Sequence, residues 1–442
     1  MLVRCAVLNG AAIDWDEAAA EATALLSEFI AIDTSNPPGN EDAACSFLGA
    51  VLRREGLSYD LYEAGPGRMS LVSRLSGDGS EGPIILLNHT DVVPVEREFW
   101  SVEPFGGEVR DGYVWGRGAL DMKGMGIFEL MAVLLLKRLG VPLRRDVVFF
   151  AMADEEMGGE YGIDWFVKNH PDLLKGDFCL NEGAFGWTSW GGVERPFFGF
   201  SPTEKGLLWL RLRTEGPPGH GSLPHAENAL GRLVRALDRV QTWGRERVIL
   251  PEMEPFFQRL AQAGALPPIN TPEDVEPVAA DDRMINALTQ NTISLTTFHS
   301  GIKTNVIPAQ AEATLDCRLL PGQSAEEFTR RVRDVIDDPK VSVEPITVFG
   351  APISRVESAL YDITEEVVRE YDERAMILPV VSSWFTDSRG FRQVGTPSYG
   401  FIPILLEQED YASIHGHNER ISLENIRLGT QVLFEVVQRL VT

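Results

Sequence analysis

Two short apolar runs in the first half of the chain each lead into a group of acidic or imidazole side chains. The run 84–87 precedes His89 and Asp91, and the run 147–150 precedes the acidic triplet 154–156. Short apolar runs bounded by polar residues are typical of buried strands. The polar groups would then lie where strands emerge from the core, which is where open α/β sheets bind ligands. We therefore expect a ligand site at that edge of a sheet.

The segments between these runs have the periodicity of amphipathic helices. Helices are expected at residues 15–35, 41–55, 123–139 and 160–169, and further strands at 58–63, 69–75 and 177–181. This alternation predicts an α/β fold with a doubly wound, mostly parallel sheet. The same pattern returns near the C-terminus, where the expected elements are a helix at 357–371, a strand at 376–381 and a helix at 423–440.

The pattern changes over the middle third of the chain. Strands are expected there at 207–213, 292–297 and 311–319, helices at 226–242 and 324–337, and only short helices and loops over 245–290. This order predicts a smaller α+β sandwich inserted into the first domain. A chain of 442 residues is long enough for two such cores. The expected bounds are 1–202 and 354–442 for the α/β domain and 203–353 for the insertion.

Charge and cysteine content exclude several classes of function. The net charge of −25 argues against nucleic acid as a partner, because binding it needs a basic surface. No apolar run reaches the roughly 18 residues of a membrane span. Residues 1–10 lack the pattern of a secretion signal, so a cytoplasmic protein is expected. The cysteines show no C-x-x-C spacing, which leaves imidazole and carboxylate as ligands for any metal; they are Cys5, Cys45, Cys179 and Cys317.

Candidate metal ligands follow the expected strands and a glycine-rich loop. Asp91 is two residues from His89, so in an extended chain it can hold one ring nitrogen of that imidazole while the other binds metal. Asp121 follows the loop 116–118 and could bridge two cations through its two oxygens. Of the adjacent Glu155 and Glu156, one would bind metal and the other would act as general base.

Two further candidate positions complete this set. Glu182 follows the strand at 177–181, and His415 and His417 precede the last helix. Two imidazoles and three carboxylates suit two divalent ions that share Asp121, with zinc preferred and cobalt or manganese as alternatives. Taken singly, each position also has an ordinary explanation, such as a surface ion pair, a helix N-cap or a solvated acid.

These segments resemble the motifs of the M20 family of metallopeptidases and amidohydrolases. The matching segments occur in the family's order and are residues 89–94, 116–124, 154–156, 181–183 and 415–419. The resemblance implies that His89 and Glu182 bind one metal ion and that Glu156 and His415 bind the other. It further implies that Asp121 bridges the ions, that Asp91 orients His89, and that Glu155 is the general base. The family spacing favours His415 over His417.

The resemblance extends to the insertion, which is similar to the family's lid and dimerisation domain. It implies that His220 donates to the oxyanion, often across a homodimer, although the position alone would suggest an ordinary loop histidine. It also implies that Asn305 and Arg318 contact the carboxylate of the substrate. Residues 382–385, which read Ser-Ser-Trp-Phe, depart from the glycine pair of many relatives and favour an apolar acyl group or side chain.

We therefore expect a dinuclear metal hydrolase that cleaves an amide bond near a free carboxylate. The substrate would be an N-acyl amino acid or a small peptide, attacked by a metal-bridging water that Glu155 activates. One alternative is the chemistry of an aminopeptidase without a lid domain, which the insertion at 203–353 argues against. Another is a binding or scaffold protein that keeps the fold without catalysis.

Overall fold

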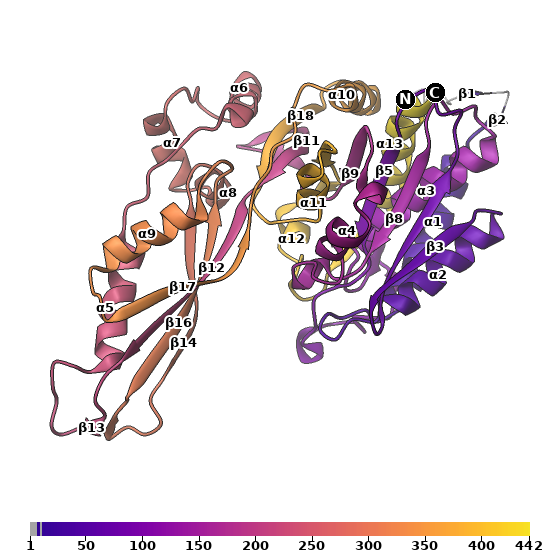
Figure 1. Cartoon of the computed structure of the whole chain (residues 1–442). Helices are drawn as coiled ribbons and strands as arrows, with labels where there is room; N and C mark the ends of the chain where they lie inside the picture. The colour runs from indigo at the N-terminus through magenta and orange to yellow at the C-terminus, as the bar shows by residue number, and fades with distance from the viewer. Residues whose placement is uncertain (1–6, 9–10) are drawn as a thin grey trace.

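The computed structural model describes residues 7–8 and 11–442, so Cys5 lies outside the described residues. It contains a ten-stranded mixed sheet and a separate four-stranded antiparallel sheet, which stand side by side in Figure 1. The predicted α/β fold class is confirmed. The two sheets are described in turn because the candidate site draws on both.

Four strands at the centre of the large sheet run parallel. They lie in the order β19 (Ser398–Gly400), β9 (Phe178–Asn181), β5 (Ile84–His89) and β8 (Val147–Met152). Along the sequence β5 comes first, β8 follows and lies on one side of it, and β9 comes next and lies on the other side. The direction of winding therefore reverses at β5. A reversal of this kind leaves a crevice at the carboxyl ends of the strands.

Antiparallel strands extend the sheet on both sides. β4 (Arg68–Leu75) and β3 (Tyr59–Gly65) follow β8, and β11 (Val193–Glu204) follows β19. The remaining strands lie beyond or beside β11 and are β10 (Gly186–Trp190), β18 (Met376–Ser382) and β20 (Leu405–Leu406). The sequence did not predict β10 or β11, whose buried aromatic residues show no helical or alternating period.

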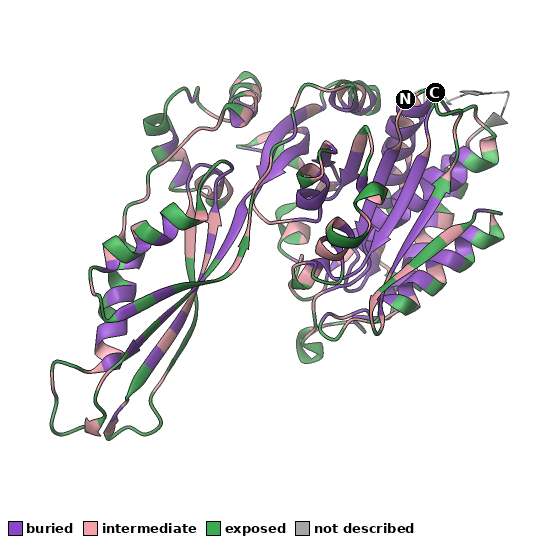
Figure 2. Ribbon diagram, viewed as in Figure 1, coloured by how far each residue is buried: buried purple, intermediate pink, exposed green. Residues whose placement is uncertain are grey.

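Helices cover both faces of the large sheet, as expected for a doubly wound fold. Residues of β5 alternate between the two faces: Ile84 and Leu86 join one hydrophobic cluster, while Ile85 and Leu87 join another. The first cluster includes α1 (Trp15–Ile30), α2 (Glu41–Arg54), α3 (Lys123–Leu139), α10 (Ala359–Tyr371) and α13 (Leu423–Val441). The second includes α4 (Ile163–Asn169) and α11 (Ser388–Gln393). Figure 2 shows the buried strands between these layers.

The first helix ends earlier than the sequence predicted. The expected helix covered residues 15–35, whereas α1 stops at Ile30. The chain then turns toward the end of β5, where the amide of Asn36 donates to the carbonyl of Val92. This contact places Asn36 beside the candidate site, a position that helical periodicity could not indicate.

The four-stranded sheet has one covered face and one open face. Its order is β14 (Thr292–Ser300), β16 (Gln310–Leu319), β12 (Gly206–Glu215) and β17 (Val341–Phe349). Helices α5 (Ala229–Thr242) and α9 (Ala325–Ile336) pack on the face that carries the buried leucines of β12. The other face of β12 carries exposed residues, among them Trp209. The open face is therefore available to line a cavity.

The segment 245–290, for which only short helices and loops are predicted, packs against the large sheet. It contains α6 (Glu254–Gln262), α7 (Pro272–Ala279) and α8 (Arg283–Leu288), which share a hydrophobic cluster with residues of β10, β11 and β18. Helices from inside the insertion thus belong to the core of the large sheet. The domain bounds at 202/203 and 353/354 stay predictions.

A buried lysine holds the crossing between the two sheets. Lys205 lies between β11 and β12, and its ammonium donates to the carbonyl oxygens of Ala287 and Gln290, each at 2.8 Å, and to Thr292 Oγ1 at 3.2 Å. These acceptors belong to the segment that returns from α8 to β14. One ammonium therefore ties the outgoing chain to the returning chain.

Short elements complete the fold. They are β1 (Val7–Leu8), β2 (Ala11–Ala12), β6 (Glu108–Arg110), β7 (Tyr113–Trp115), β13 (Gly219–His220), β15 (Val306–Ile307), β21 (Arg420–Ser422), α12 (Gln408–Tyr411) and the 3₁₀ helices η1 (Arg97–Phe99), η2 (Glu155–Met157), η3 (Pro171–Leu174) and η4 (Pro251–Met253). Within the described residues, no helix is long and apolar enough to cross a membrane. Cys45, Cys179 and Cys317 are buried and form no disulfide.

A buried acid in α3 contacts the end of β5. The amide of Asn88 donates to Glu129 Oε2 at 2.7 Å, and both side chains are fully buried. Asn88 Oδ1 and Glu129 Oε1 find no hydrogen-bond partner among the described residues. Burial raises the pKa of Glu129 well above its ordinary value, although the bond from Asn88 opposes this. Burial thus keeps Glu129 protonated to a higher pH than an exposed glutamate.

This pair predicts how stability changes with pH. Unfolded chains ionise Glu129 near its ordinary pKa of 4.5, whereas the folded chain keeps the proton to higher pH. The wild type should therefore lose stability as the pH rises above 4.5, and the Glu129→Gln variant should lack this component. Glu129→Leu removes the acceptor of Asn88 and should cost about 1–3 kcal/mol. Chemical denaturation from pH 5 to 8 measures all three; parallel pH profiles for wild type and Glu129→Gln would contradict the assignment.

Candidate metal centre

Three neighbouring parallel strands bring acidic and imidazole side chains to one edge of the large sheet. His89 is the last residue of β5, Glu155 and Glu156 lie in η2 just after β8, and Glu182 follows β9. Because β5 lies between β8 and β9, the three groups meet at adjacent strand ends. The sequence predicted this convergence from the apolar runs that precede each group.

Asp121 lies between two histidines that come from distant parts of the chain. Its Oδ1 is 3.1 Å from His89 Nε2, and its Oδ2 is 3.1 Å from His415 Nε2. Asp121 lies just before α3, while His415 lies in the segment before α13. Each carboxylate oxygen therefore faces a different imidazole, which is the arrangement needed to share one carboxylate between two cations.

Two further acids complete the group around these histidines. Glu156 Oε2 is 3.3 Å from His415 Nε2, and Glu182 Oε1 is 3.6 Å from His89 Nε2. Two triads could each hold a metal ion, because within each triad the potential ligand atoms lie within 4.8 Å of one another. The triads are His89–Asp121–Glu156 and His89–Glu155–Glu182. We call the six residues His89, Asp121, Glu155, Glu156, Glu182 and His415 the cluster.

The carboxylates of the cluster repel one another in a buried place. Burial, together with the charge of Asp121, raises the pKa of Glu182 well above its ordinary value and that of Glu156 to about 7. Burial and the charge of Glu182 raise the pKa of Glu155 well above its ordinary value. Ionising these acids together is costly unless cations lie among them. The group thus has the electrostatic character of a cation site.

The pKa values of the two histidines also rise, because the neighbouring acids favour the charged imidazolium. Hydrogen bonding to Asp121 and Glu156 raises the pKa of His415 to about 10. Burial lowers the pKa of His89, but contacts with Asp121 and Asp91 outweigh it and raise the pKa well above its ordinary value. Asp121 itself is held below its ordinary pKa, because the two histidines outweigh its burial. Imidazole and carboxylate are ligands that Zn²⁺ accepts, so the donor set fits such an ion.

Asp91 contacts the loop that carries the two glutamates. His89 Nδ1 lies 2.9 Å from the backbone carbonyl of Asp91 and 3.5 Å from its carboxylate. That carboxylate accepts hydrogen bonds from the backbone N–H groups of Glu155 and Glu156, each at 3.2 Å. It also accepts one from the side-chain amide of Asn36 at 2.8 Å. The sequence predicted a contact with the imidazole. The structure adds that Asp91 holds the backbone of η2 in place.

Glu419 holds the loop that precedes α3. Its buried carboxylate accepts from Arg117 at 2.6 Å and from three backbone N–H groups at 2.8–3.1 Å, those of Gly118, Leu120 and Asp121. The carboxylate thereby positions the backbone of Asp121. The motif at 415–419 contains Glu419 but indicates no role for it, because its partners lie about 300 positions earlier in the chain.

His417 lies outside the cluster. Its Nε2 is 4.0 Å from Glu96, and its ring lies 5.1 Å from that of Phe99. The structure thus brings His415, and not His417, to Asp121 and Glu156. The left-handed backbone of His415, with φ at 57°, turns the chain at this point.

A cavity of about 550 Å³ opens beside the cluster. Its polar lining comes from Asp121, Glu155, Glu156, Glu182, Thr347, Arg318 and His415, and its apolar lining includes Val93, Met157, Phe185, Leu207, Trp209, Phe349, Trp384, Phe385, Tyr411 and Ile414. Ligand cavities typically have volumes of about 300–1,000 Å³ and a mostly apolar lining. The walls come from both sheets, because β12, β16 and β17 contribute residues of their open face.

Arg318 reaches this cavity with part of its guanidinium already engaged. Its Nε and one terminal nitrogen donate to the two oxygens of Asp316 at 2.7 and 3.0 Å. The other terminal nitrogen is buried and has no hydrogen-bond partner among the described residues. Because Arg318 lines the cavity, this unpartnered donor is a candidate partner for an anionic ligand.

His220 and Asn305 lie away from the cluster within one chain. β13, which contains His220, pairs with β15 at the far tip of the four-stranded sheet, as Figure 1 shows. There the amide of Gly221 donates to the carbonyl of Asn305 at 2.8 Å, and His220 Nδ1 lies 2.7 Å from Ser222 Oγ. Of the ten predicted site residues, His220 and Asn305 therefore lie close to each other but apart from the other eight.

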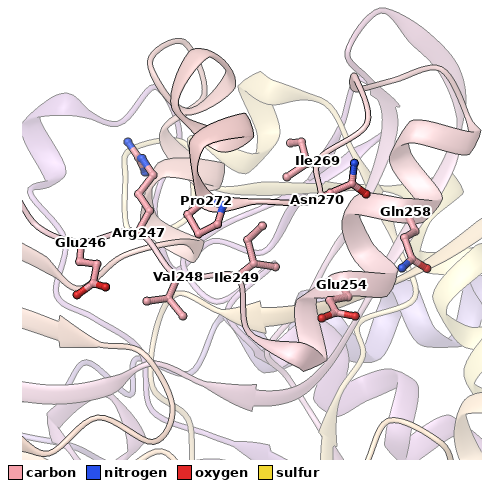
Figure 3. A pocket seen from close by; sticks show the side chains of 9 residues that line it. All are labelled: Glu246, Arg247, Val248, Ile249, Glu254, Gln258, Ile269, Asn270 and Pro272. Carbon is pink, nitrogen blue, oxygen red and sulfur yellow. The ribbon is translucent and has the colours of Figure 1, made fainter.

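A second cavity, of about 470 Å³, lies among the helices beside the large sheet. Figure 3 shows its lining, from the segment 246–249 and from residues near α6 and α7. Arg247 lies there with its guanidinium bonded to Glu276, Thr289 and Asn286. None of the described residues that line this cavity is a histidine or cysteine. The cavity beside the cluster is therefore the better candidate for chemistry.

Comparisons with known proteins point to one family. The family model for peptidase family M20/M25/M40 matches residues 85–439. The chain is 34% identical over 380 residues to the N-fatty-acyl-amino acid synthase/hydrolase PM20D1 of Xenopus tropicalis, covering 80% of this chain and 72% of that one. It is 30% identical over 423 residues to aminoacylase-1 of Sus scrofa, covering 92% and 93%. The M20 family metallo-carboxypeptidase Sso-CP2 of Sulfolobus solfataricus has the same fold, with a TM-score of 0.75 at 20% identity over 95% of this chain and 98% of that one.

The contacts of Glu419 predict a large effect on stability. Glu419→Gln leaves the guanidinium of Arg117 buried without a counter-charge, which should lower the free energy of unfolding by about 3–5 kcal/mol. Guanidinium denaturation measures this change. Glu409→Gln, at a side chain that is 84% exposed, is the control and should shift stability by less than about 0.5 kcal/mol. Equal stabilities for the two variants would contradict the role given to Glu419.

Proposed function

The chain belongs to peptidase family M20/M25/M40, and from that membership we propose that it hydrolyses the amide bond of N-acyl amino acids with two divalent metal ions. It is an enzyme of the peptidase and amidohydrolase class, as its relatives are. The proposal narrows this class to substrates with an apolar acyl group and a free carboxylate. Small peptides with an apolar side chain are the nearest alternative substrates.

The observation that carries the proposal is the place of Asp121 between His89 and His415. A carboxylate whose two oxygens each face an imidazole at 3.1 Å is suited to join two metal sites. In this proposal His89 and Glu182 hold one ion, His415 and Glu156 hold the other, and Asp121 bridges them. Zinc is the proposed metal, with cobalt or manganese as alternatives. The ions would polarise the scissile carbonyl and lower the pKa of water.

Glu155 is the proposed general base. It lies in the cavity lining next to Glu156, and Asp91 accepts the backbone N–H groups of both residues. Burial and nearby acids raise its pKa, which makes its carboxylate a better proton acceptor than an exposed glutamate. In the proposed reaction Glu155 takes a proton from the attacking water and passes it to the leaving nitrogen.

The cavity supports the choice of substrate. The unpartnered nitrogen of Arg318 is proposed to hold the carboxylate of the amino acid, while Asp316 fixes the rest of the guanidinium. The acyl group would lie against Trp384 and the aromatic residues around it. This aromatic lining is consistent with the departure from glycine at residues 382–385, and it favours apolar over charged acyl groups.

A second copy of the chain is proposed to complete the site. His220 is proposed to donate to the oxyanion and Asn305 to contact the substrate, yet both lie at the far tip of the four-stranded sheet. Strand β14 is an edge of that sheet and exposes Leu295 and Phe298 at 43% and 42%. An exposed edge strand with apolar side chains is suited to pairing with another copy. A homodimer could thereby bring the tip of one chain to the cluster of the other.

The alternatives to this proposal fit less well. The chemistry of an aminopeptidase without a lid domain is disfavoured, because Leu207, Trp209 and Phe349 of the four-stranded sheet form part of the cavity wall. A non-catalytic scaffold does not agree with the family membership of the chain. An assay panel of N-acyl amino acids and dipeptides, run with metal analysis, tests the proposal; turnover of dipeptides alone would overturn the choice of substrate.

Removal of the proposed base predicts a separation of catalysis from metal binding. Glu155→Ala should lower kcat by at least about 100- to 10,000-fold, because the attacking water loses its proton acceptor. Metal content should stay near two ions per chain, since Glu155 is not a proposed ligand. Steady-state kinetics and elemental analysis of the same preparation measure the two quantities.

The control for this variant lies in the same loop. Glu160 is exposed and lines no cavity described here, so Glu160→Ala should keep wild-type kcat and metal content. Full activity of Glu155→Ala would sink its assignment as the base. Loss of metal together with activity would instead make Glu155 a ligand.

The proposed dimer predicts complementation between two inactive variants. His220→Ala and Glu155→Ala should each be inactive alone, because each chain lacks one proposed group. Mixed dimers contain one site in which Glu155 and His220 are both intact, since they come from different chains. An equimolar mixture, after subunit exchange, should regain about a quarter of wild-type activity. Activity no greater than that of the separate variants would contradict a shared site.

A further inference from the structure

Tyr411 forms part of the wall of two cavities. One is the cavity beside the cluster, and the other, of about 1,080 Å³, lies between β10, α8 and the start of α12. Of the described residues that line the two cavities, Tyr411 alone is common to both. The two cavities therefore adjoin at Tyr411.

Two other aromatic rings support this wall on the catalytic side. The ring of Phe185 lies 6.2 Å from that of Tyr411, edge to face, and 6.1 Å from that of Trp384. Phe185 is only 2% exposed and belongs to the main hydrophobic core. Tyr411 lies instead on α12, a single turn of helix. Tyr411 packs against this core but is only partly buried, so making it smaller should disturb the core less than shortening Phe185.

The 1,080 Å³ cavity has both apolar and acidic side chains in its lining. Trp187, Met284 and Leu406 give it an apolar surface near the residues of β10 and β20. Glu194, Asp281, Asp282 and Glu407 also line it, against one cation, Arg283. An alkyl chain can lie on the apolar side chains, whereas a carboxylate would be repelled by the acids. A substrate would therefore enter with its acyl end and leave its carboxylate near Arg318.

We propose that Tyr411 sets the longest acyl chain that the enzyme accepts, and that the cavity behind it would accommodate longer chains if the ring were removed. This proposal rests on the proposed function, because it assumes N-acyl amino acids as substrates. It assigns a specificity-determining role to a residue outside the motifs. The chemical class concerned is N-acyl amino acids with linear, saturated acyl groups.

The wild type should show a chain-length optimum. Each added methylene that is buried in the cavity should raise kcat/KM about fourfold. The increase should stop once the chain reaches Tyr411, because further methylenes have no room. A series of N-acyl derivatives of one amino acid, from acetyl to stearoyl, measures this profile.

The Tyr411→Ala variant tests the proposal. Its optimum should move to longer chains, and kcat/KM for the chain just beyond the wild-type optimum should rise about fourfold per added methylene. The change should appear mainly in KM, because the reacting groups are untouched. Metal content should stay at the wild-type level, which separates a change in the wall from damage to nearby His415.

Three further variants sharpen the test. Tyr411→Phe keeps the ring and should keep the wild-type optimum, since the hydroxyl bonds to no described residue. Met284→Trp, added to Tyr411→Ala, should fill part of the 1,080 Å³ cavity and move the optimum back to shorter acyl chains. Tyr371→Ala removes an exposed tyrosine of α10 that lines neither cavity, and should leave the whole profile unchanged.

The outcomes distinguish the two proposals. If the wild type hydrolyses N-acyl amino acids but Tyr411→Ala keeps its optimum at full metal content, the role of Tyr411 is overturned and the function stands. If the wild type hydrolyses none of the series, both proposals fall together. If Tyr411→Ala is misfolded, Tyr411→Val takes its place and should show a smaller shift in the same direction; no shift would overturn the role of Tyr411.

Discussion

Like charge held in a buried place is the constraint on which the rest of this structure depends. Glu155, Glu156 and Glu182 gather around Asp121 with only two imidazoles for neutralisation. Such a group is stable only if the surrounding backbone is stiff and if cations or protons offset the charge. The fold meets the first condition by placing most of the group at the ends of adjacent parallel strands. The chemistry of the donor atoms meets the second.

Rigidity around the cluster comes from other buried charges. Glu419 accepts three backbone N–H groups of the loop before α3, and the guanidinium of Arg117 neutralises it. Asp91 does the same for η2, where it accepts two backbone N–H groups. These two carboxylates hold the backbone near the cluster in place and leave the side-chain atoms of the cluster free. The residues of the cluster are thus positioned by acids that lie one layer behind them.

Much of the fold and of the cluster could be predicted from local patterns in the sequence. α3 begins and ends where the helical period does, and His89 follows a continuous apolar run. Residues such as Tyr411 and Phe185 gave no such signal, because an aromatic residue in a cavity wall looks like one in a core. Glu419 and Asn36 act through contacts that join distant segments. The packing of α6–α8 on the large sheet was likewise hidden, since short helices show little periodicity.

The cavity wall and the cluster are encoded by separate stretches of the chain. The residues of β12 and β17 that line the cavity belong to the four-stranded sheet, whereas the cluster lies in the large sheet and its loops. The ammonium of Lys205 keeps the two parts in register where the chain crosses between them. Mutations in those strands can therefore reshape the wall without altering a single cluster residue. Selection can tune which molecules are accepted while the machinery for breaking the bond is inherited intact.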